Sequence, residues 1–239
     1  QFTIPQGLVR AYLGNREAFA IKVVMRGYDA MNGGNLIATS EIGIAARTSV
    51  TVPIEICRAT AVDIRRVELT ATNAVCEIID DLTWDPKPDL GTITTVNFDE
   101  RADRTRVTTQ YAGLNFPDSP WIRTATALGL TASSAPNVLE QYSFGLEFDP
   151  APLRIEFTPA QAWVRVLAGN SFQGSSPRIT MRVYAELVGG SPVAVVYTER
   201  FSATINTPLE VCRLLDRDIR RIEIQQDPSV FEVVDTLQF

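Results

Sequence analysis

Short stretches in which apolar and polar residues alternate fill most of this chain. An alternation of period two places successive side chains on opposite faces of a β-strand. Clusters of Gly, Pro, Asn and Asp, such as NGGN at 32–35 and GGSP at 189–192, separate the stretches and are typical of turns. In the first third of the chain the pattern predicts six strands, at residues 8–13, 21–30, 35–44, 49–57, 65–71 and 74–84.

The chain contains an internal repeat. Residues 54–84 align without a gap to residues 209–239, and 12 of these 31 positions are identical. The most visible part is Cys-Arg-x4-Asp-Ile-Arg-Arg-x-Glu, which begins at Cys57 and again at Cys212. The match extends to further pairs of segments, 2–15 with 157–170 and, after a one-residue shift, 25–34 with 181–190. A duplication on this scale has to be recognised before any local structure is assigned.

The repeat decides one ambiguous segment. Residues 16–31 could form an amphipathic helix by their spacing alone. Their counterpart, SPRITMRVYAELV at 176–188, alternates and carries β-branched residues, which favour strands. Because two copies of one fold must agree, we predict strands in both.

Evenly spaced short strands predict an all-β protein built of tandem antiparallel β-sandwich repeats, jelly-roll-like in outline. We expect residues 1–87 to hold only the back half of a repeat and residues 88–239 to hold a complete one. The front half, about residues 90–155, has no counterpart, since residue 1 aligns with residue 156. Such a first repeat would expose an apolar face and open strand edges. We expect upstream repeats of a longer chain or a neighbouring copy to supply the missing strands.

Composition excludes several classes of function. The net charge is -6 and no long basic run occurs, which argues against nucleic acid or an anionic membrane as partner. The sequence has no histidine, so histidine-based catalytic triads and histidine metal sites are excluded. No stretch approaches 18 consecutive apolar residues, so we expect no membrane insertion. We predict that the protein is not an enzyme and requires no cofactor.

The order of motifs in the second copy resembles a known class of proteins. The motifs are NFDE at 97–100, VTTQYAGLNF at 107–116, LEFDPAPLRIEFTPAQAWVRV at 146–166, a VYAELVGGSPVAVV hairpin at 183–196, and FEVVDTLQF at 231–239. This order resembles the secreted jelly-roll-like β-sandwich repeats of bacterial surface proteins, similar in outline to carbohydrate-binding modules. The resemblance implies an extracellular or cell-surface location and, in some members, calcium or glycan binding.

Two acidic residues are a candidate calcium site. The first and last strands run near each other in jelly-roll modules, so the resemblance implies that Asp99 and Asp235 could share a calcium ion. Calcium takes six to eight oxygen ligands, and no D-x-D-x-D-G loop is present. The alternative is that each aspartate accepts hydrogen bonds from backbone N–H groups at the end of a strand.

Aromatic residues are a candidate glycan-binding surface. Sugar rings stack on exposed aromatic faces, and Trp121, in the loop-like sequence PDSPWIRT, is the best candidate, with Tyr111 nearby in sequence. The alternative is that Trp121 covers the open end of the sandwich.

The cysteines leave a disulfide open. Secretion favours a bond between Cys57 and Cys76, whereas the alternation puts them on opposite faces, which disfavours it. Cys212 has no partner within its own copy. We also predict cross-strand ion pairs between Arg66 and Glu77 and, in the second copy, between Arg221 and Glu232.

Two functions follow from these patterns. The first is a non-catalytic extracellular structural or adhesive repeat of a surface fibre, sheath or stalk, which assembles through sandwich edges or strand complementation. The alternative is a carbohydrate-binding module stabilised by calcium.

Overall fold

The structure is a computed structural model that describes residues 1–72, 77–128, 130–132, 134, 136–141, 151–170, 178–198, 204–205, 207–214, 216–227 and 232–239. Regular structure in these residues consists of strands, apart from one 3-10 helix, and most neighbouring strands pair antiparallel. The protein is therefore all-β, as the alternating pattern predicts. The chain forms two compact units, which are described separately below.

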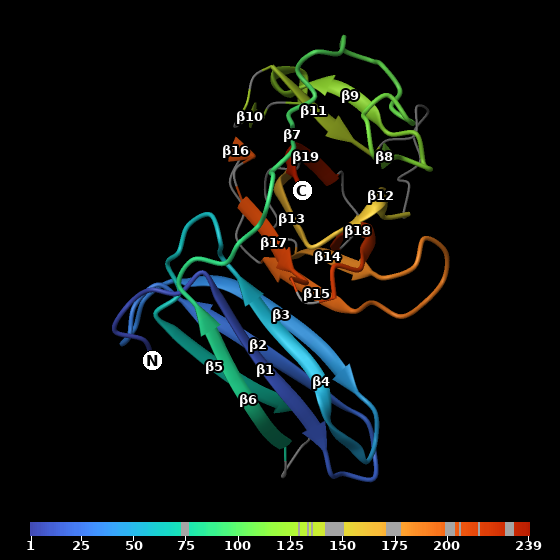
Figure 1. The fold of residues 1–239 in the computed structure, drawn as a ribbon. Helices are drawn as coiled ribbons and strands as arrows, with labels where there is room; N and C mark the ends of the chain where they lie inside the picture. Colours follow the sequence, from blue (N-terminus) through green and yellow to red (C-terminus); the bar gives the residue numbers. More distant parts are fainter. Residues whose placement is uncertain are drawn as a thin grey trace. The chain divides into compact units, whose positions relative to one another are not determined.

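The first unit comprises Gln1–Gly91 together with Ala194–Val196 and Glu210–Cys212. One of its sheets has the strand order β4-β1-β6, and the other has the order β5-β2-β3 (Figure 1). At the outer side of β3, Val195 and Val196 pair antiparallel with Glu41 and Ser40. The strands are β1 (Leu8–Asn15), β2 (Ile21–Tyr28), β3 (Leu36–Ile44), β4 (Thr48–Cys57), β5 (Arg66–Thr72) and β6 (Glu77–Asp85).

These six strands confirm the six that alternation predicts, including β2, where a helix was the competing interpretation. The first residues of the predicted sixth strand lie outside the described residues. One apolar core lies between the two sheets, because strands of both contribute fully buried residues to it. The core is formed by Val9, Ala11, Leu13, Ile21, Val23, Met25, Ile44, Ile54, Ile56 and Ile64.

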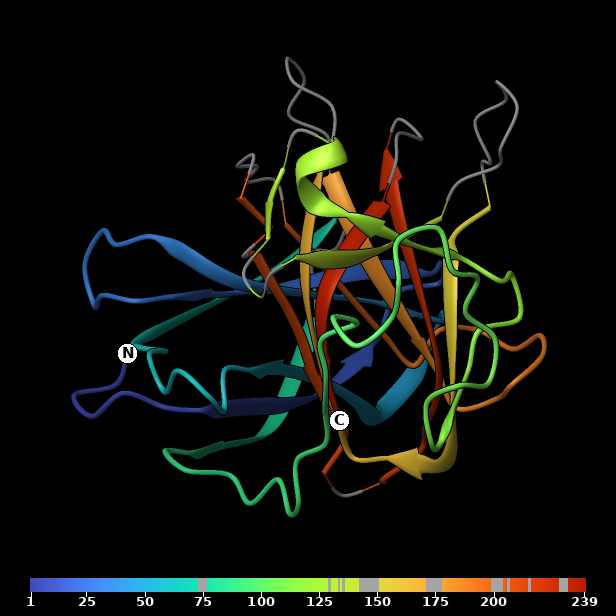
Figure 2. The ribbon, with the colours of Figure 1, turned by 90° about the horizontal axis from the view of Figure 1, so that it is seen from above.

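The second unit comprises Thr92–Val193, Tyr197–Leu209 and Arg213–Phe239. One sheet has the order β17-β13-β19-β11-β9, with β7 also pairing β19, and the other contains β14-β18-β12-β8. The 3-10 helix Ala125–Leu128 follows directly on β9 (Figure 2). The strands are β7 (Thr95–Val96), β8 (Leu114–Asn115), β9 (Trp121–Thr124), β10 (Thr131–Ala132), β11 (Asn137–Glu140), β12 (Leu153–Gln161), β13 (Trp163–Asn170), β14 (Arg178–Tyr184), β16 (Thr204–Ile205), β18 (Ile219–Asp227) and β19 (Glu232–Gln238), while β15 (Ala194–Thr198) and β17 (Thr207–Cys212) have residues in both units.

Strands that the sequence repeat relates have the same neighbours in both units. The order β4-β1-β6 of the first unit corresponds to β17-β13-β19 of the second, and β5-β2 corresponds to β18-β14. The register is also shared: Arg10 lies opposite Thr83 and Arg165 opposite Gln238, which are the same positions of the repeat. A β-bulge follows at the same point in each pair of strands.

The two units differ where the sheets end. In the second unit, β11 and β9 continue one sheet beyond β19, and β12 and β8 continue the other beyond β18. In the first unit β6 and β5, the counterparts of β19 and β18, are the last described strands of their sheets. Both sheets of the first unit thus stop on the same side, where the sequence comparison lacks a front half.

The prediction that Arg66 and Glu77 are cross-strand neighbours is wrong, and the side chain of Glu77 lies outside the described ones. Strand β5 belongs to one sheet and β6 to the other, so the two residues are not cross-strand neighbours. The chain crosses between the layers after β5, and alternation within each strand carries no information about that crossing.

Candidate functional site

The last strand of the first unit exposes large apolar side chains. Ile79, Leu82 and Trp84 on β6 are 46%, 48% and 55% exposed. Monomeric proteins seldom leave several such residues together on the edge strand of a sheet, because an open edge can pair with another chain. The open side bounded by β6 and β5 is therefore the candidate functional site.

The exposed residues of β6 face the core side of their sheet. Ile79 lies opposite Leu13, and Trp84 lies opposite Val9, on the neighbouring strand β1. Directly opposed residues point to the same face of a sheet, and Leu13 and Val9 are fully buried core residues. Ile79 and Trp84 therefore extend the apolar core layer outward to the edge, where water reaches it.

In the second unit the equivalent positions are covered. Val234 and Leu237, the counterparts of Ile79 and Leu82, are fully buried. Val234 lies opposite Leu139 of β11, and Leu237 lies opposite Val96 of β7. The same sequence positions are thus buried when front-half strands are present and exposed when they are not.

The strand at the other edge shows the same difference. Ile222 and Ile224 of β18 are fully buried and lie opposite Ile155 and Leu153 of β12. Their counterparts Val67 and Leu69 of β5 pack against the core of the first unit but are only half-buried. Each front-half strand therefore buries about two apolar side chains that the first unit leaves partly in water.

One aromatic contact of the repeat is present in both units. The rings of Phe2 and Trp84 lie 5.8 Å apart at 50°, and those of their counterparts Phe157 and Phe239 lie 5.5 Å apart at 60°. Phe2 is anchored by its backbone N–H, which donates to Arg65 O at 2.8 Å. Trp84 remains 55% exposed despite this contact, and Ile79 and Leu82 remain about half exposed.

The Cys-Arg-x4-Asp motif forms a closed loop in each unit. The guanidinium of Arg58 donates two hydrogen bonds to the Asp63 carboxylate, at 3.0 and 2.7 Å, and Arg213 binds Asp218 in the same way, at 3.0 Å in both. The residue before each aspartate has a positive φ, 51° and 47°. Burial would lower the pKa of Arg58, but its hydrogen bond and charge interaction with Asp63 raise it. The motif is therefore a turn clamped by an ion pair.

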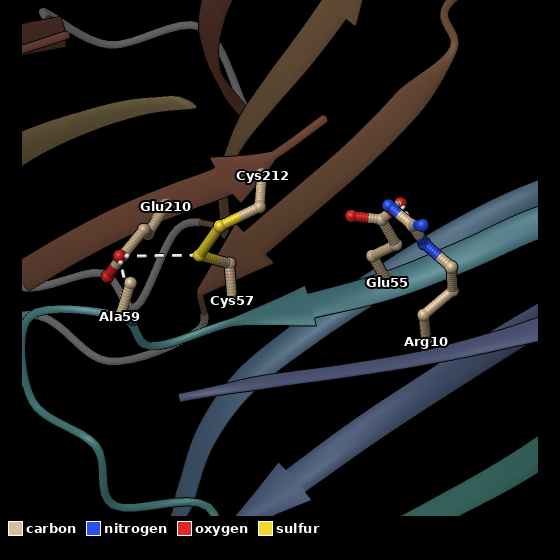
Figure 3. Close-up of a disulfide and its surroundings, with 6 residues drawn as sticks. All are labelled: Arg10, Glu55, Cys57, Ala59, Glu210 and Cys212. Carbon is tan, nitrogen blue, oxygen red and sulfur yellow. Dashed lines mark hydrogen bonds and ion pairs between the residues drawn. A yellow bond between two sulfur atoms is a disulfide. The ribbon is translucent and has the colours of Figure 1, made fainter. Parts of the chain in front are cut away.

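The disulfide joins two equivalent positions of the repeat. Cys57 is bonded to Cys212, with a Cα–Cα distance of 5.6 Å, so the bond between Cys57 and Cys76 that the sequence left open is not the one that forms (Figure 3). Alternation predicted that Cys57 points to the face opposite Ile56, and Cys57 is absent from the core cluster that contains Ile56. Cys57 instead contacts the segment Glu210–Cys212, which belongs to the same unit. Cys76 lies outside the described residues.

A carboxylate of the repeat lies beside the disulfide. Glu210 Oε1 accepts a hydrogen bond from Ala59 N at 3.0 Å and lies 3.5 Å from Cys57 Sγ (Figure 3). Its counterpart Glu55 accepts a hydrogen bond from Arg10 Nε at 2.6 Å and forms a buried ion pair with that side chain. Each glutamate therefore links its own strand to a neighbouring segment by a hydrogen bond or an ion pair.

The arginine and glutamate of DIRR-x-E pair along their own strand. Arg66 Nε lies 3.2 Å from Glu68 Oε1, and the guanidinium lies 4.1 Å from the centre of the Tyr28 ring. Burial, and then a hydrogen bond to Glu68, raises the pKa of Tyr28. The second copy repeats the arrangement with Arg221, Glu223 and Tyr184. The predicted ion pair between Arg221 and Glu232 stays a prediction, because the side chain of Glu232 lies outside the described ones.

The two aspartates of the predicted calcium site hold backbone groups. Asp99 Oδ1 accepts the backbone N–H of Asn137 at 2.9 Å, and the fully buried Asp235 accepts that of Ser134 at 2.8 Å. Among the described residues, no group of three or more cysteine, aspartate or glutamate side chains is arranged to hold a metal ion. These are the hydrogen bonds expected of the alternative, in which each aspartate accepts backbone N–H groups. A calcium ion shared by Asp99 and Asp235 stays a prediction.

The two aromatic candidates are not an open platform. Tyr111 is 8% exposed and makes edge contacts with Phe98 and Phe116. Burial, and then the nearby Glu100, raises the pKa of Tyr111. Trp121 is half-buried, and the guanidinium of Arg106 lies 4.7 Å from the centre of its ring. Glycan binding at these residues stays a prediction.

Sequence reasoning missed a buried carboxylate in β11. Glu140 is 2% exposed and pairs with Arg123 Nη1 at 3.1 Å, and Arg123 Nε lies 3.6 Å from Asp103. Burial raises the pKa of Glu140, against the opposing effect of Arg123. In NVLE no local pattern marks the glutamate as buried, because the strands that enclose it come from elsewhere in the chain.

Comparisons with protein-family models, curated proteins and solved structures give no match to this chain. Within the described residues, no helix has the length and apolar character needed to cross a membrane.

Proposed function

We propose that the protein is a non-catalytic extracellular structural protein built of two copies of a β-sandwich repeat, and that it assembles through the open side of its first unit. The observation that carries this proposal is the contrast between Ile79 and Leu82, about half exposed, and their fully buried counterparts Val234 and Leu237. A position that is core in one copy and surface in the other is suited to being covered by a partner.

The charged residues support a structural function. Buried arginines and carboxylates pair with each other, as in Arg10 with Glu55 and Arg123 with Glu140. Buried ion pairs of this kind hold neighbouring segments in a defined arrangement, since an unpaired buried charge is costly. The paired groups of both copies therefore serve the fold.

The disulfide supports the extracellular location. Disulfides between buried cysteines persist in oxidising compartments and are rare in the reducing cytosol of most organisms. Cys57 and Cys212 are 3% and 1% exposed, and they are bonded. A secreted or surface protein is the setting that fits this bond.

Light scattering coupled to size-exclusion chromatography tests the assembly. Over a wide concentration series, the molar mass of the wild-type chain should rise above that of the monomer. Leu82→Lys places a charge on the open side and should shift the series towards the monomer. Val188→Lys is the matched control, because Val188 is 82% exposed and lies in the second unit.

Two results would contradict the proposal. The first is a wild-type chain that stays monomeric at every concentration. The second is a Leu82→Lys variant that associates as strongly as wild type while retaining the wild-type circular dichroism spectrum.

A further inference from the structure

The open side of the first unit has a defined occupant. We infer that it binds a polypeptide strand with the pattern of β11, inserted antiparallel beside β6 in the register that β11 holds beside β19. This inference rests on the proposed assembly at the open side, and it adds the chemistry, direction and register of the incoming segment.

The template for the occupant lies in the chain itself. The neighbours of β6 and β19 are otherwise equivalent, since β1 pairs with β6 in the register in which β13 pairs with β19. On its other side β19 carries β11, and β7 pairs with a further part of the same edge, whereas β6 carries no further strand among the residues described. What fits beside β19 should therefore fit beside β6.

The register follows from the repeat. Leu139 lies opposite Val234, and Glu140 lies opposite Val233. The counterparts of Val234 and Val233 are Ile79 and Ile78. A bound strand should therefore place an apolar residue opposite Ile79 and extend the sheet order to β4-β1-β6 plus one strand.

The occupant must bring apolar side chains. Val138 and Leu139 of β11 are fully buried, and Val138 belongs to a cluster with Val233, Ile205, Ala125 and Leu130. Strand addition gains main-chain hydrogen bonds from any sequence, while the pockets for alternate side chains provide specificity. A strand with a polar residue at the position of Leu139 would leave Ile79 of β6 in contact with water.

A second β6 strand is a poor occupant. The sequence EIIDDLTWD of β6 contains four acidic residues and no basic one. Two such strands side by side would bring like charges together across the pair, which is destabilising. The sequence NVLE of β11 carries a single acidic residue. Charge therefore favours a β11-like strand over edge-to-edge pairing of two copies.

The test uses the full chain and a fluorescent synthetic peptide of residues 134–141, SAPNVLEQ. Fluorescence anisotropy should show saturable binding to the wild-type chain. Ile79→Lys in the chain, or Leu139→Lys in the peptide, should weaken binding about tenfold or more, which corresponds to a loss of about 1.4 kcal/mol of binding free energy. Val188→Lys should bind as wild type.

A photo-reactive leucine at position 139 of the peptide reports the register. After irradiation, mass spectrometry should locate the crosslink in residues 78–80 of the chain. A crosslink elsewhere, or binding that is unaffected by Ile79→Lys, would overturn the inference.

The outcomes separate the two proposals. If the chain self-associates through the open side and the peptide does not bind, the occupant is wrong and the assembly stands. If the peptide binds at β6 while the chain stays monomeric, strand addition stands and assembly between copies is wrong.

Discussion

Cys57 and Cys212 are bonded to each other, and they occupy the same position in the two copies of the repeat. Each is followed by an arginine that clamps an aspartate five residues further on. The motif thus has two functions in the fold: its arginine and aspartate close a loop in each copy, and its cysteines pair across copies.

The disulfide should stabilise the protein strongly, because it closes a loop with a sequence separation of 155 residues. Replacing both cysteines by serine should lower the free energy of unfolding by about 2–5 kcal/mol, measured by urea unfolding. Peptide mapping without reduction should recover Cys57 linked to Cys212. The Cys76→Ser variant is the control and should keep that linkage, whereas a Cys57–Cys76 peptide would contradict the structure.

The arginine clamps should require the guanidinium and not merely a positive charge. Lysine cannot donate two parallel hydrogen bonds to one carboxylate, so Arg213→Lys should lower the free energy of unfolding by about 1–2 kcal/mol. Arg213 also lies 2.9 Å from Asp216 and is largely buried. Arg104→Lys is the matched control, because the Arg104 side chain is 67% exposed. Equal stability of Arg213→Lys and wild type would show that the paired hydrogen bonds from Arg213 to Asp218 contribute nothing to the free energy of unfolding.

Glu140 should make stability depend on pH in a characteristic direction. Its pKa is raised by burial, so between the ordinary value of about 4.3 and the raised value the folded chain binds more protons than the unfolded chain. The contribution of Glu140 to stability is therefore present at low pH and is lost as pH rises through this window. Glutamine at this position has no proton to lose.

The free energy of unfolding of Glu140→Gln, minus that of wild type, should therefore increase from about pH 4 to about pH 7. Urea unfolding at several pH values measures the difference, and Glu186→Gln, at an exposed position, is the control. A difference that stays constant or falls with pH would be the opposite result.

Equivalent core positions should differ in their sensitivity to truncation. Ile224→Ala removes a fully buried side chain and should cost about 2–5 kcal/mol of the stability of the second unit. Leu69, at the same position of the repeat, is half-buried at the open edge, so Leu69→Ala should cost about half as much or less. Chemical unfolding followed separately in each variant measures both losses. A larger loss for Leu69→Ala would mean that β5 is not an open edge.

Local pattern was sufficient for the strands. Alternation located β1 to β5 within a few residues, and agreement between the copies identified β2 as a strand, because side-chain period reports directly which backbone conformation buries an apolar face. The repeat also predicted an open apolar face in the first copy. It did not identify Ile79, Leu82 and Trp84 as the residues involved, since identical alternation occurs in buried and exposed strands.

The sequence alone therefore determined the class of fold, the strands and the duplication, which can be recognised from the order and alternation of residues along the chain. The tertiary structure decided the disulfide partner of Cys57, the separation of β5 and β6 into different sheets, and the burial of Glu140. These features depend on segments that are distant in sequence, and period-two patterning specifies which face a side chain takes without specifying which strand lies beside it.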